Sequence, residues 1–323
     1  MKAIIWGACG SLPTPTTPSQ IYDKLKNALW SARNEQFTHK ADVDAYLETL
    51  PRSAHGSYHG NTSCVEIQTA EQDVILCDAG SGLRDYSNSI PSGTAPRTYH
   101  IFLSHLHWDH IQGFPFFTPA YIPGNRIILH GVHPTIEAAI RNQMNAPCFP
   151  VPFETMRADV EFNQLQEGCE LQIGGVCVRA IRQQHPGDSW GYRFEQQDKV
   201  IVYSSDSEHK EDYKCPNSPF VEFFKHADIL IFDGQYSPED STNAKRSWGH
   251  SDYITAIELA AHAQVRQLCL FHHEPRNSDE EIEALHQSAL EYNKQFNQLH
   301  TTEALQTYPI AISLAYDGLT LEA

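Results

Sequence analysis

The feature that most restricts this chain is the segment SHLHWDH at residues 104–110, which holds three histidines and one aspartate. It follows an apolar segment that predicts a β-strand. In an extended chain alternate side chains share a face, so His105 and His107 point to the same side. Asp109 and His110 come where the chain turns, and they can reach a second point close by. Two imidazoles for one ion, and a carboxylate with an imidazole for its neighbour, predict half of a binuclear metal site.

A chance cluster of histidines on an exposed loop is the alternative. The cluster lies between two apolar stretches, Phe102-Leu103 and Phe114-Pro115-Phe116, which favours a buried strand end. Such a site needs ligands from elsewhere in the chain, and candidates that follow other predicted strands are His185, Asp206 and the pair His272-His273. Each of them alone is typical of an ordinary loop or turn. Together they lie where loops place functional side chains on a rigid scaffold.

Strand-like segments follow one another in hairpin-like pairs, with helical segments between the groups. This order predicts a layered α/β sandwich in one compact domain, and not a strict alternation of strand and helix. We expect strands at residues 2–7, 63–69, 73–78, 100–104, 126–130, 160–165, 170–173, 176–182, 191–195, 200–204, 229–233 and 267–271, and helices at 21–50, 134–145, 251–263 and 278–296.

Composition limits the classes of binding partner and the cellular compartment that we expect. The 323 residues contain 23 Lys and Arg against 40 Asp and Glu, and the formal charge of −17 argues against wide, non-specific binding of nucleic acid. None of the eight cysteines forms a C-x-x-C pair, so we expect buried, reduced thiols. The first apolar stretch is too short for a signal peptide, and no segment reaches the roughly 20 apolar residues of a membrane span. We expect a soluble cytoplasmic protein.

The sequence resembles the metallo-β-lactamase fold superfamily, whose signature is H-x-H-x-D-H, and within it the branch of ribonuclease Z and the cyclic-nucleotide phosphodiesterases. The resemblance covers nearly the whole chain. Its motifs are the histidine cluster, His185, Asp206, and the segments GACGS at 7–11, GNTSC at 60–64, DAGSG at 78–82, GHS at 249–251 and FHH at 271–273. It implies a single domain over residues 1–323 with the four-layer αββα sandwich of that family, which agrees with the strand pairing above.

The resemblance also implies two divalent metal ions. The first would be bound by His105, His107 and His185, the second by Asp109, His110 and His272, and both by a bridging Asp206. Zinc is the default for imidazole and carboxylate ligands, and manganese or iron also fit. His272 is preferred to His273 because it lies 22 residues after His250, the spacing of the phosphodiesterase-like members; His273 would then support the ligands from behind. Asp78 would hold the ligands in place, with a simple strand-end turn as the alternative.

His250 indicates which part of the superfamily the chain resembles. In phosphodiesterase-like members a histidine at this position contacts the scissile phosphate and assists the leaving group. A helix-capping loop histidine is the alternative. A water that bridges the two ions would become hydroxide, the nucleophile, with Asp109 to orient it. His250 would donate a proton to the departing oxygen. Relatives often have His-Ser-Thr where this chain has Asp252 after Ser251, so the role of Asp252 is open. Lys245 and Arg246 lie nearby as phosphate contacts or as a solvated basic pair.

A small phosphodiester such as a cyclic nucleotide is the expected substrate. Long RNA is disfavoured by the charge, and because only residues 186–205, 20 residues, separate His185 from Asp206, which leaves no room for the RNA-gripping arm of ribonuclease Z. The alternatives are hydrolysis of a lactone, thioester, β-lactam or other ester, and a non-catalytic metal-binding sensor. Residues 16–59 depart from shorter relatives and predict a helical cap near the site entrance or a plain surface insertion. The resemblance also implies a homodimer.

Overall fold

The computed structural model describes residues 1–209, 218–239, 247–299 and 310–323, and the strands among them form two seven-stranded sheets. The first sheet has the strand order β14 (Thr320–Glu322), β1 (Lys2–Gly7), β2 (Cys64–Gln68), β3 (Val74–Cys77), β4 (Thr98–Phe102), β5 (Arg126–Gly131) and β6 (Asp159–Gln164). The second has the order β13 (Ala311–Leu314), β12 (Gln267–Phe271), β11 (Ile229–Asp233), β10 (Lys199–Ser204), β9 (Trp190–Gln196), β8 (Val176–Arg182) and β7 (Glu170–Ile173).

Both sheets combine an antiparallel part with a parallel part. In the first sheet the pairs β14–β1, β1–β2 and β2–β3 are antiparallel, and the pairs β3–β4, β4–β5 and β5–β6 are parallel. In the second sheet the pairs β7–β8, β8–β9 and β9–β10 are antiparallel, and the pairs β10–β11, β11–β12 and β12–β13 are parallel. Parallel neighbours end on the same edge of a sheet. The loops after β3, β4 and β5, and those after β10, β11 and β12, are therefore grouped in space.

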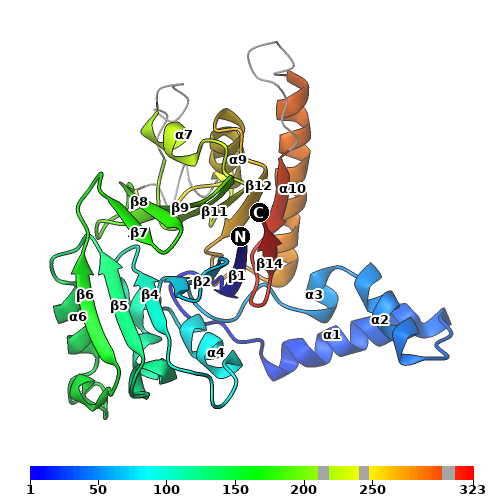
Figure 1. The fold of residues 1–323 in the computed structure, drawn as a ribbon. Coiled ribbons are helices and arrows are strands. Elements are labelled where there is room, and N and C mark those ends of the chain that lie inside the picture. Colours follow the sequence, from blue (N-terminus) through cyan, green and yellow to red (C-terminus); the bar gives the residue numbers. More distant parts are fainter. Residues whose placement is uncertain (210–217, 240–246, 300–309) are drawn as a thin grey trace.

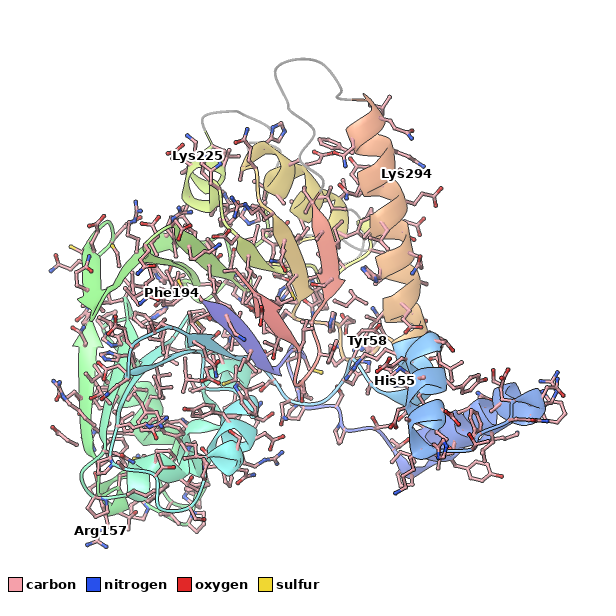
Figure 2. The ribbon with its side chains drawn as sticks, turned by 45° about the vertical axis from the view of Figure 1, so that its right-hand side comes forward. His55, Tyr58, Arg157, Phe194, Lys225 and Lys294 are labelled. Atoms are coloured by element: carbon pink, nitrogen blue, oxygen red, sulfur yellow. The ribbon has the colours of Figure 1, made fainter. Side chains whose placement is uncertain are left out.

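Three apolar layers hold the sheets and helices together. Residues that alternate along the strands meet between the two sheets, among them Ile5, Ile75 and Phe102 from the first sheet and Phe194 and Ile231 from the second. Phe194 lies inside the body of the molecule in Figure 2. Because the opposite faces of both sheets are also apolar, each must be covered by further elements.

Helices cover both outer faces (Figure 1). The first sheet packs against α4 (Gly82–Ser89) and α6 (Ile136–Gln143), and the second against α7 (Pro219–Phe224), α9 (Tyr253–His262) and α10 (Asp279–Leu299). Short helices in the loops of the first half of the chain include α5 (Trp108–Ile111), η2 (Phe114–Phe116), η3 (Thr118–Tyr121) and η4 (Phe153–Thr155). The predicted four-layer αββα sandwich in a single domain is confirmed.

Residues 18–55 form an arm of α1 (Pro18–Ser31), η1 (Ala32–Asn34), α2 (Lys40–Thr49) and α3 (Arg52–His55), which extends from the body (Figure 1). Its base is fixed near the start of α10, where Lys24 Nζ lies 2.6 Å from Asp279 Oδ2 and Ser53 Oγ donates to Glu283. Figure 2 places His55 and Tyr58 at this junction. No residue of α1 is buried.

Several expected elements differ from the structure. The predicted helix at 21–50 is divided after Ser31, because the Asp42 carboxylate accepts hydrogen bonds from the amides of Thr38 and His39 and starts a new helix there. Strands β13 and β14 and helices α4 and α7 were not predicted. Asp252 caps α9 by accepting from the Thr255 amide at 2.8 Å, which settles its local role. Across the described residues, none of the helices has the length and apolarity that a bilayer crossing requires.

Candidate metal centre

The predicted ligands come from loops that follow strands of both sheets. His105 and His107 lie in the loop after β4, while Asp109 and His110 lie on α5, a single helical turn. The loops after β8, β10 and β12 supply the remaining three, His185, Asp206 and His272. One edge of the sandwich thus collects side chains that are up to 167 residues apart, from His105 to His272.

The ligands form two groups that share Asp206. One nitrogen each of His105, His107 and His185 lie within 4.8 Å of one another, and so do the ligand atoms of Asp109, His110 and His272. Asp206 Oδ2 lies 3.8 Å from His105 Nε2 and 3.7 Å from His185 Nε2. Its other oxygen, Oδ1, lies 3.2 Å from His110 Nε2 and 3.4 Å from His272 Nε2. Each oxygen of one carboxylate therefore faces a different group.

These separations fit two metal ions. Two ligand atoms about 2.1 Å from a tetrahedral ion lie about 3.4 Å apart. Asp109 Oδ2 lies 3.4 Å from Nε2 of both His110 and His272, close to that value. In addition, His105 Nε2 and His110 Nε2 are buried atoms that lack a hydrogen-bond partner among the described residues. Buried polar atoms normally have a partner, and a cation would provide it.

The charges of the site also favour cations. Burial and the neighbouring His110 lower the pKa of His105, and burial lowers the pKa of His185. Burial opposes the ionisation of Asp206, but the surrounding histidines outweigh it and lower its pKa. Neutral imidazole and ionised carboxylate are the forms that bind metals. For His110 the carboxylates of Asp206 and Asp109 outweigh burial and raise the pKa, and a dication would take the place of that proton.

Asp78 holds the second group from behind. Its side chain is fully buried directly after β3 and accepts hydrogen bonds from the Ser104 amide at 2.7 Å, from Tyr203 Oη at 2.6 Å and from His110 Nδ1 at 2.7 Å. The bond from Nδ1 fixes the imidazole so that its Nε2 faces Asp206. Such hydrogen bonds are typical of carboxylates that support metal-binding histidines.

A backbone carbonyl orients His185 in the same way. His185 Nδ1 donates to the carbonyl oxygen of Gly249 at 2.8 Å, which leaves Nε2 for the first group. Gly249 has a φ of 92°, and a Cβ at this position would overlap His185 Nδ1. Glycine adopts this positive φ without strain, and its lack of a Cβ leaves room for the His185 ring.

His250 lies beside both groups and pairs with a carboxylate. Its ring stacks on His272 with centroids 5.0 Å apart and meets the His185 ring edge-on at 5.0 Å. His250 Nδ1 donates to Asp233 Oδ2 at 2.8 Å. Burial opposes protonation of His250, but the Asp233 carboxylate outweighs it and raises its pKa to about 9. Atoms of His250 also lie within 4.8 Å of ligand atoms of His185 and Asp206, so the ring borders the metal groups directly.

His273 faces away from the ligands. Its Nε2 donates to the carbonyl of Ala315 at 2.8 Å, and its ring meets Tyr58 edge-on at 6.2 Å. Its backbone amide and carbonyl bond to Ala8 and Gly10, and so they fix the chain beside His272. The structure thus places His272, and not His273, with Asp109 and His110, as the spacing predicts.

Three contributors were missed by the sequence reasoning. Asp233 lies at the end of β11, and its signal was the strand-end position that Asp206 shares. The Ser11 amide donates to Asp109 Oδ2 at 2.8 Å, and the Glu208 carboxylate accepts from the Gly249 amide at 3.2 Å. No sequence pattern marks these two contacts. Lys245 and Arg246, expected to be phosphate contacts or a solvated basic pair, lie outside the described residues.

The fold and the cluster of histidines and carboxylates at one edge of the sandwich define an αββα domain with a candidate metal centre. The chain belongs to the family described as "Beta-lactamase superfamily domain", whose model matches residues 74–273. It is similar to ribonuclease Z of Brevibacillus brevis, 37% identical over 83 residues that cover 26% of this chain and 24% of that protein. It is also similar to ribonuclease Z of Prochlorococcus marinus, 22% identical over 267 residues that cover 67% of this chain and 82% of that one.

Among solved structures, the fold is similar to the metallo-beta-lactamase fold protein YhfI from Bacillus subtilis, with a TM-score of 0.65 and 17% identity over 100% of this chain and 98% of that one. The predicted superfamily and fold are confirmed. The coarse expectation of a metal-dependent hydrolase agrees with the family and with its named relatives.

Proposed function

We propose that the chain is a binuclear metal-dependent phosphodiesterase that acts on a small phosphodiester such as a cyclic nucleotide. The observation that carries this proposal is the arrangement around Asp206. Its two oxygens face two separate groups of ligand atoms, while His250, held by Asp233, stacks beside them. The named relative that matches over most of its own length, 82%, is a ribonuclease, an enzyme that cleaves phosphodiester bonds.

The proposed ligand sets follow the geometry. His105, His107 and His185 would hold the first ion, Asp109, His110 and His272 would hold the second, and Asp206 would contact both. Bound divalent ions, with zinc as the first choice and manganese or iron as alternatives, acidify water and offset the charge on phosphoryl oxygens. Asp109 Oδ2, fixed by the Ser11 amide, lies where it can orient the attacking water. Burial opposes its ionisation, but His110 and His272 hold its pKa well below the usual range.

His250 supplies the proton that the leaving group needs. Asp233 is fully buried and also accepts from the Ser207 amide at 3.1 Å, so its carboxylate cannot turn away. It therefore fixes the His250 ring by Nδ1 and leaves Nε2 for the substrate. A protonated imidazole in this position would donate to the departing oxygen and stabilise the charge that builds on the phosphoryl group.

Two observations favour a small substrate over long RNA. Residues 186–205 are filled by a short loop and the hairpin of β9 and β10, so no gripping arm arises between His185 and Asp206. Residues 16–59, which do form an arm, contain five Lys and Arg and five Asp and Glu and are therefore neutral. A neutral arm on a chain with a formal charge of −17 offers no electrostatic attraction for a polyanion.

The 16–59 insertion begins and ends beside the site. Ser11 contacts Asp109 just before it, and the Gly60 amide donates to Cys9 Sγ just after it. We propose that the base of this insertion, not α1 or α2, borders the site entrance.

The homodimer stays a prediction. Light scattering during gel filtration of the full chain tests it, and a mass of one chain would contradict it.

A substrate panel tests the proposed function. The purified protein, loaded with zinc or manganese, is given bis(4-nitrophenyl) phosphate, cyclic mononucleotides, cyclic dinucleotides and a precursor tRNA, beside a lactone, a thioester and a β-lactam. We expect turnover of small diesters, and in His250→Ala a large loss of it for the cyclic nucleotides, whose alkoxide leaving groups need a proton. Bis(4-nitrophenyl) phosphate, whose nitrophenolate leaves without one, should lose little. Metal analysis of the same preparation is expected to give two ions per chain.

Each other outcome points to a different activity. Turnover of no phosphodiester with either metal would remove the substrate class. Ester or lactam turnover that survives in His250→Ala would replace the proposal by a different hydrolysis on the same metals. Fewer than one ion per chain, with no turnover at all, would leave a non-catalytic sensor.

A further inference from the structure

Large apolar side chains are exposed around the polar metal centre. Trp108 is 66% exposed, Trp248 is 59% exposed and Leu12 is 55% exposed. A single exposed apolar residue needs no explanation. These three, however, come from three distant segments, and each lies next to a residue that contacts a predicted ligand.

The three connections are specific. Trp108 stands between the ligands His107 and Asp109, at the first residue of α5. Trp248 precedes Gly249, whose carbonyl accepts from His185 Nδ1. Leu12 follows Ser11, whose amide donates to Asp109 Oδ2. The backbones of the rim residues, meaning Leu12, Trp108 and Trp248, therefore adjoin residues that belong to or contact both metal groups.

The backbone beneath both indoles is held in place. The amides of Ser247 and Gly249, on either side of Trp248, donate to the Glu208 carboxylate at 3.0 and 3.2 Å. The carbonyl of Trp108 accepts from the Gln112 amide at 2.8 Å. Aromatic side chains on a fixed backbone lose little entropy when they bind a ligand, which makes them suited to recognition.

We propose that Trp108 and Trp248 form an aromatic subsite that stacks on the nucleobase, or another flat aromatic ring, of the phosphodiester substrate. This inference rests on the proposed function. Two residues span at most about 7 Å, so the backbone of Trp248 stays within that distance of His250. A phosphate at the metal groups directs its organic substituents outward, across the rim. Indole faces stack on any base, while Leu12 adds an apolar contact without selecting one.

Two substrates with the same leaving group isolate the subsite. Thymidine 5′-(4-nitrophenyl) phosphate carries a nucleobase, and methyl 4-nitrophenyl phosphate carries none. We expect the wild type to prefer the thymidine diester in kcat/KM, and Trp108→Ala and Trp248→Ala each to lower kcat/KM for that diester about 5- to 150-fold. Turnover of the methyl diester should be unchanged. Trp108→Phe and Trp248→Phe, which keep an aromatic ring, should retain most of the preference.

The matched control is Trp30→Ala. Trp30 is a comparably exposed indole, 69% exposed, but it lies on α1 in the arm. Its replacement should change kcat/KM for neither diester. If the rim variants lose the same factor on both diesters, the tryptophans merely support the ligand loops and the inference is overturned. Equal kcat/KM of the wild type for the two diesters overturns it as well.

Binding separates this inference from the proposed function. Calorimetry of the metal-loaded protein compares thymidine 5′-monophosphate with methyl phosphate. Tighter binding of the nucleotide, lost in Trp108→Ala and Trp248→Ala, supports the subsite even if neither diester is hydrolysed, in which case only the proposed function fails. Equal binding of the two phosphates by the wild type overturns the subsite whatever the turnover.

Discussion

Replacing Asp233 by asparagine should make the enzyme dependent on a good leaving group. Asp233→Asn keeps the size of the side chain but removes the charge that lies 2.8 Å from His250 Nδ1. Because Asp233 is fully buried, solvent cannot replace the lost interaction with the imidazole. His250 then loses the partner that outweighs its burial, and its pKa falls from about 9. A larger share of the enzyme holds a neutral His250, which has no proton to donate.

The size of the effect follows from the lost hydrogen bond. A hydrogen bond to a charged group contributes about 1.5–3 kcal/mol, which corresponds to about 10- to 150-fold in rate. This loss should appear with thymidylyl-thymidine, whose alkoxide leaving group needs a proton. Nitrophenolate leaves without one, so the rate with thymidine 5′-(4-nitrophenyl) phosphate should change little. His250→Ala should show the same contrast with a larger loss, up to the roughly 10²- to 10⁴-fold of general acid catalysis.

The assay is kcat for both diesters in the zinc-loaded enzyme, with metal content measured in each preparation. Asp228→Asn is the matched control, because Asp228 is a buried aspartate at the opposite end of β11 that pairs with Arg266 at 2.5 Å. It should lower stability without changing the ratio of the two rates. Equal losses on both diesters in Asp233→Asn, or no loss on either, would refute the role given to the pair.

Three further changes test the site and the core. Asp206→Asn should lower the metal content of the purified protein from two ions to fewer than one per chain, measured by mass spectrometry of the metals, since each oxygen faces a different group. Gly249→Ala should displace His185 and lower the affinity of the first ion by at least about tenfold, measured by competition with a chelating dye. His209→Leu should change the pH dependence of stability, because burial lowers the pKa of His209 to about 3. The unfolded chain takes up a proton near pH 6.5 and the folded chain does not, so this stability is present above pH 6.5 and is lost as the pH falls towards 3. At pH 5 the variant should therefore gain roughly 2 kcal/mol on the wild type relative to pH 7.5, as measured by urea unfolding. Phe220→Leu, in the same aromatic surroundings, should cost the same at both pH values, and a similar constant difference for His209→Leu would contradict the reasoning.

The sequence predicts those parts of the site in which the relative positions of the side chains are set by a short stretch of chain. His105 and His107 share a face because the chain between them is extended, and Asp109 and His110 follow within one helical turn. His185, Asp206 and the pair His272-His273 were candidates because strand ends are marked by a change from apolar to polar residues, and the spacing of the resembling family selected His272. The same local logic locates most strands to within two residues. It fails for β14, only three residues long, and for α4, whose sequence GLRDYSNS is largely polar.

The contacts that orient the ligands are non-local, and for that reason the sequence does not show them. Asp78 and Asp233 both end apolar strands and both accept from an imidazole Nδ1, yet one holds the predicted ligand His110 and the other holds His250. The difference lies in the sheet each strand joins: β3 places Asp78 beneath α5, whereas β11 runs beside β10 and β12 and brings Asp233 under the loop of His250. An aspartate after a buried strand thus indicates a supporting role. Which histidine it supports is decided by the strand order: in the proposed function the imidazole held by Asp78 would bind a metal ion, and the one held by Asp233 would carry the proton.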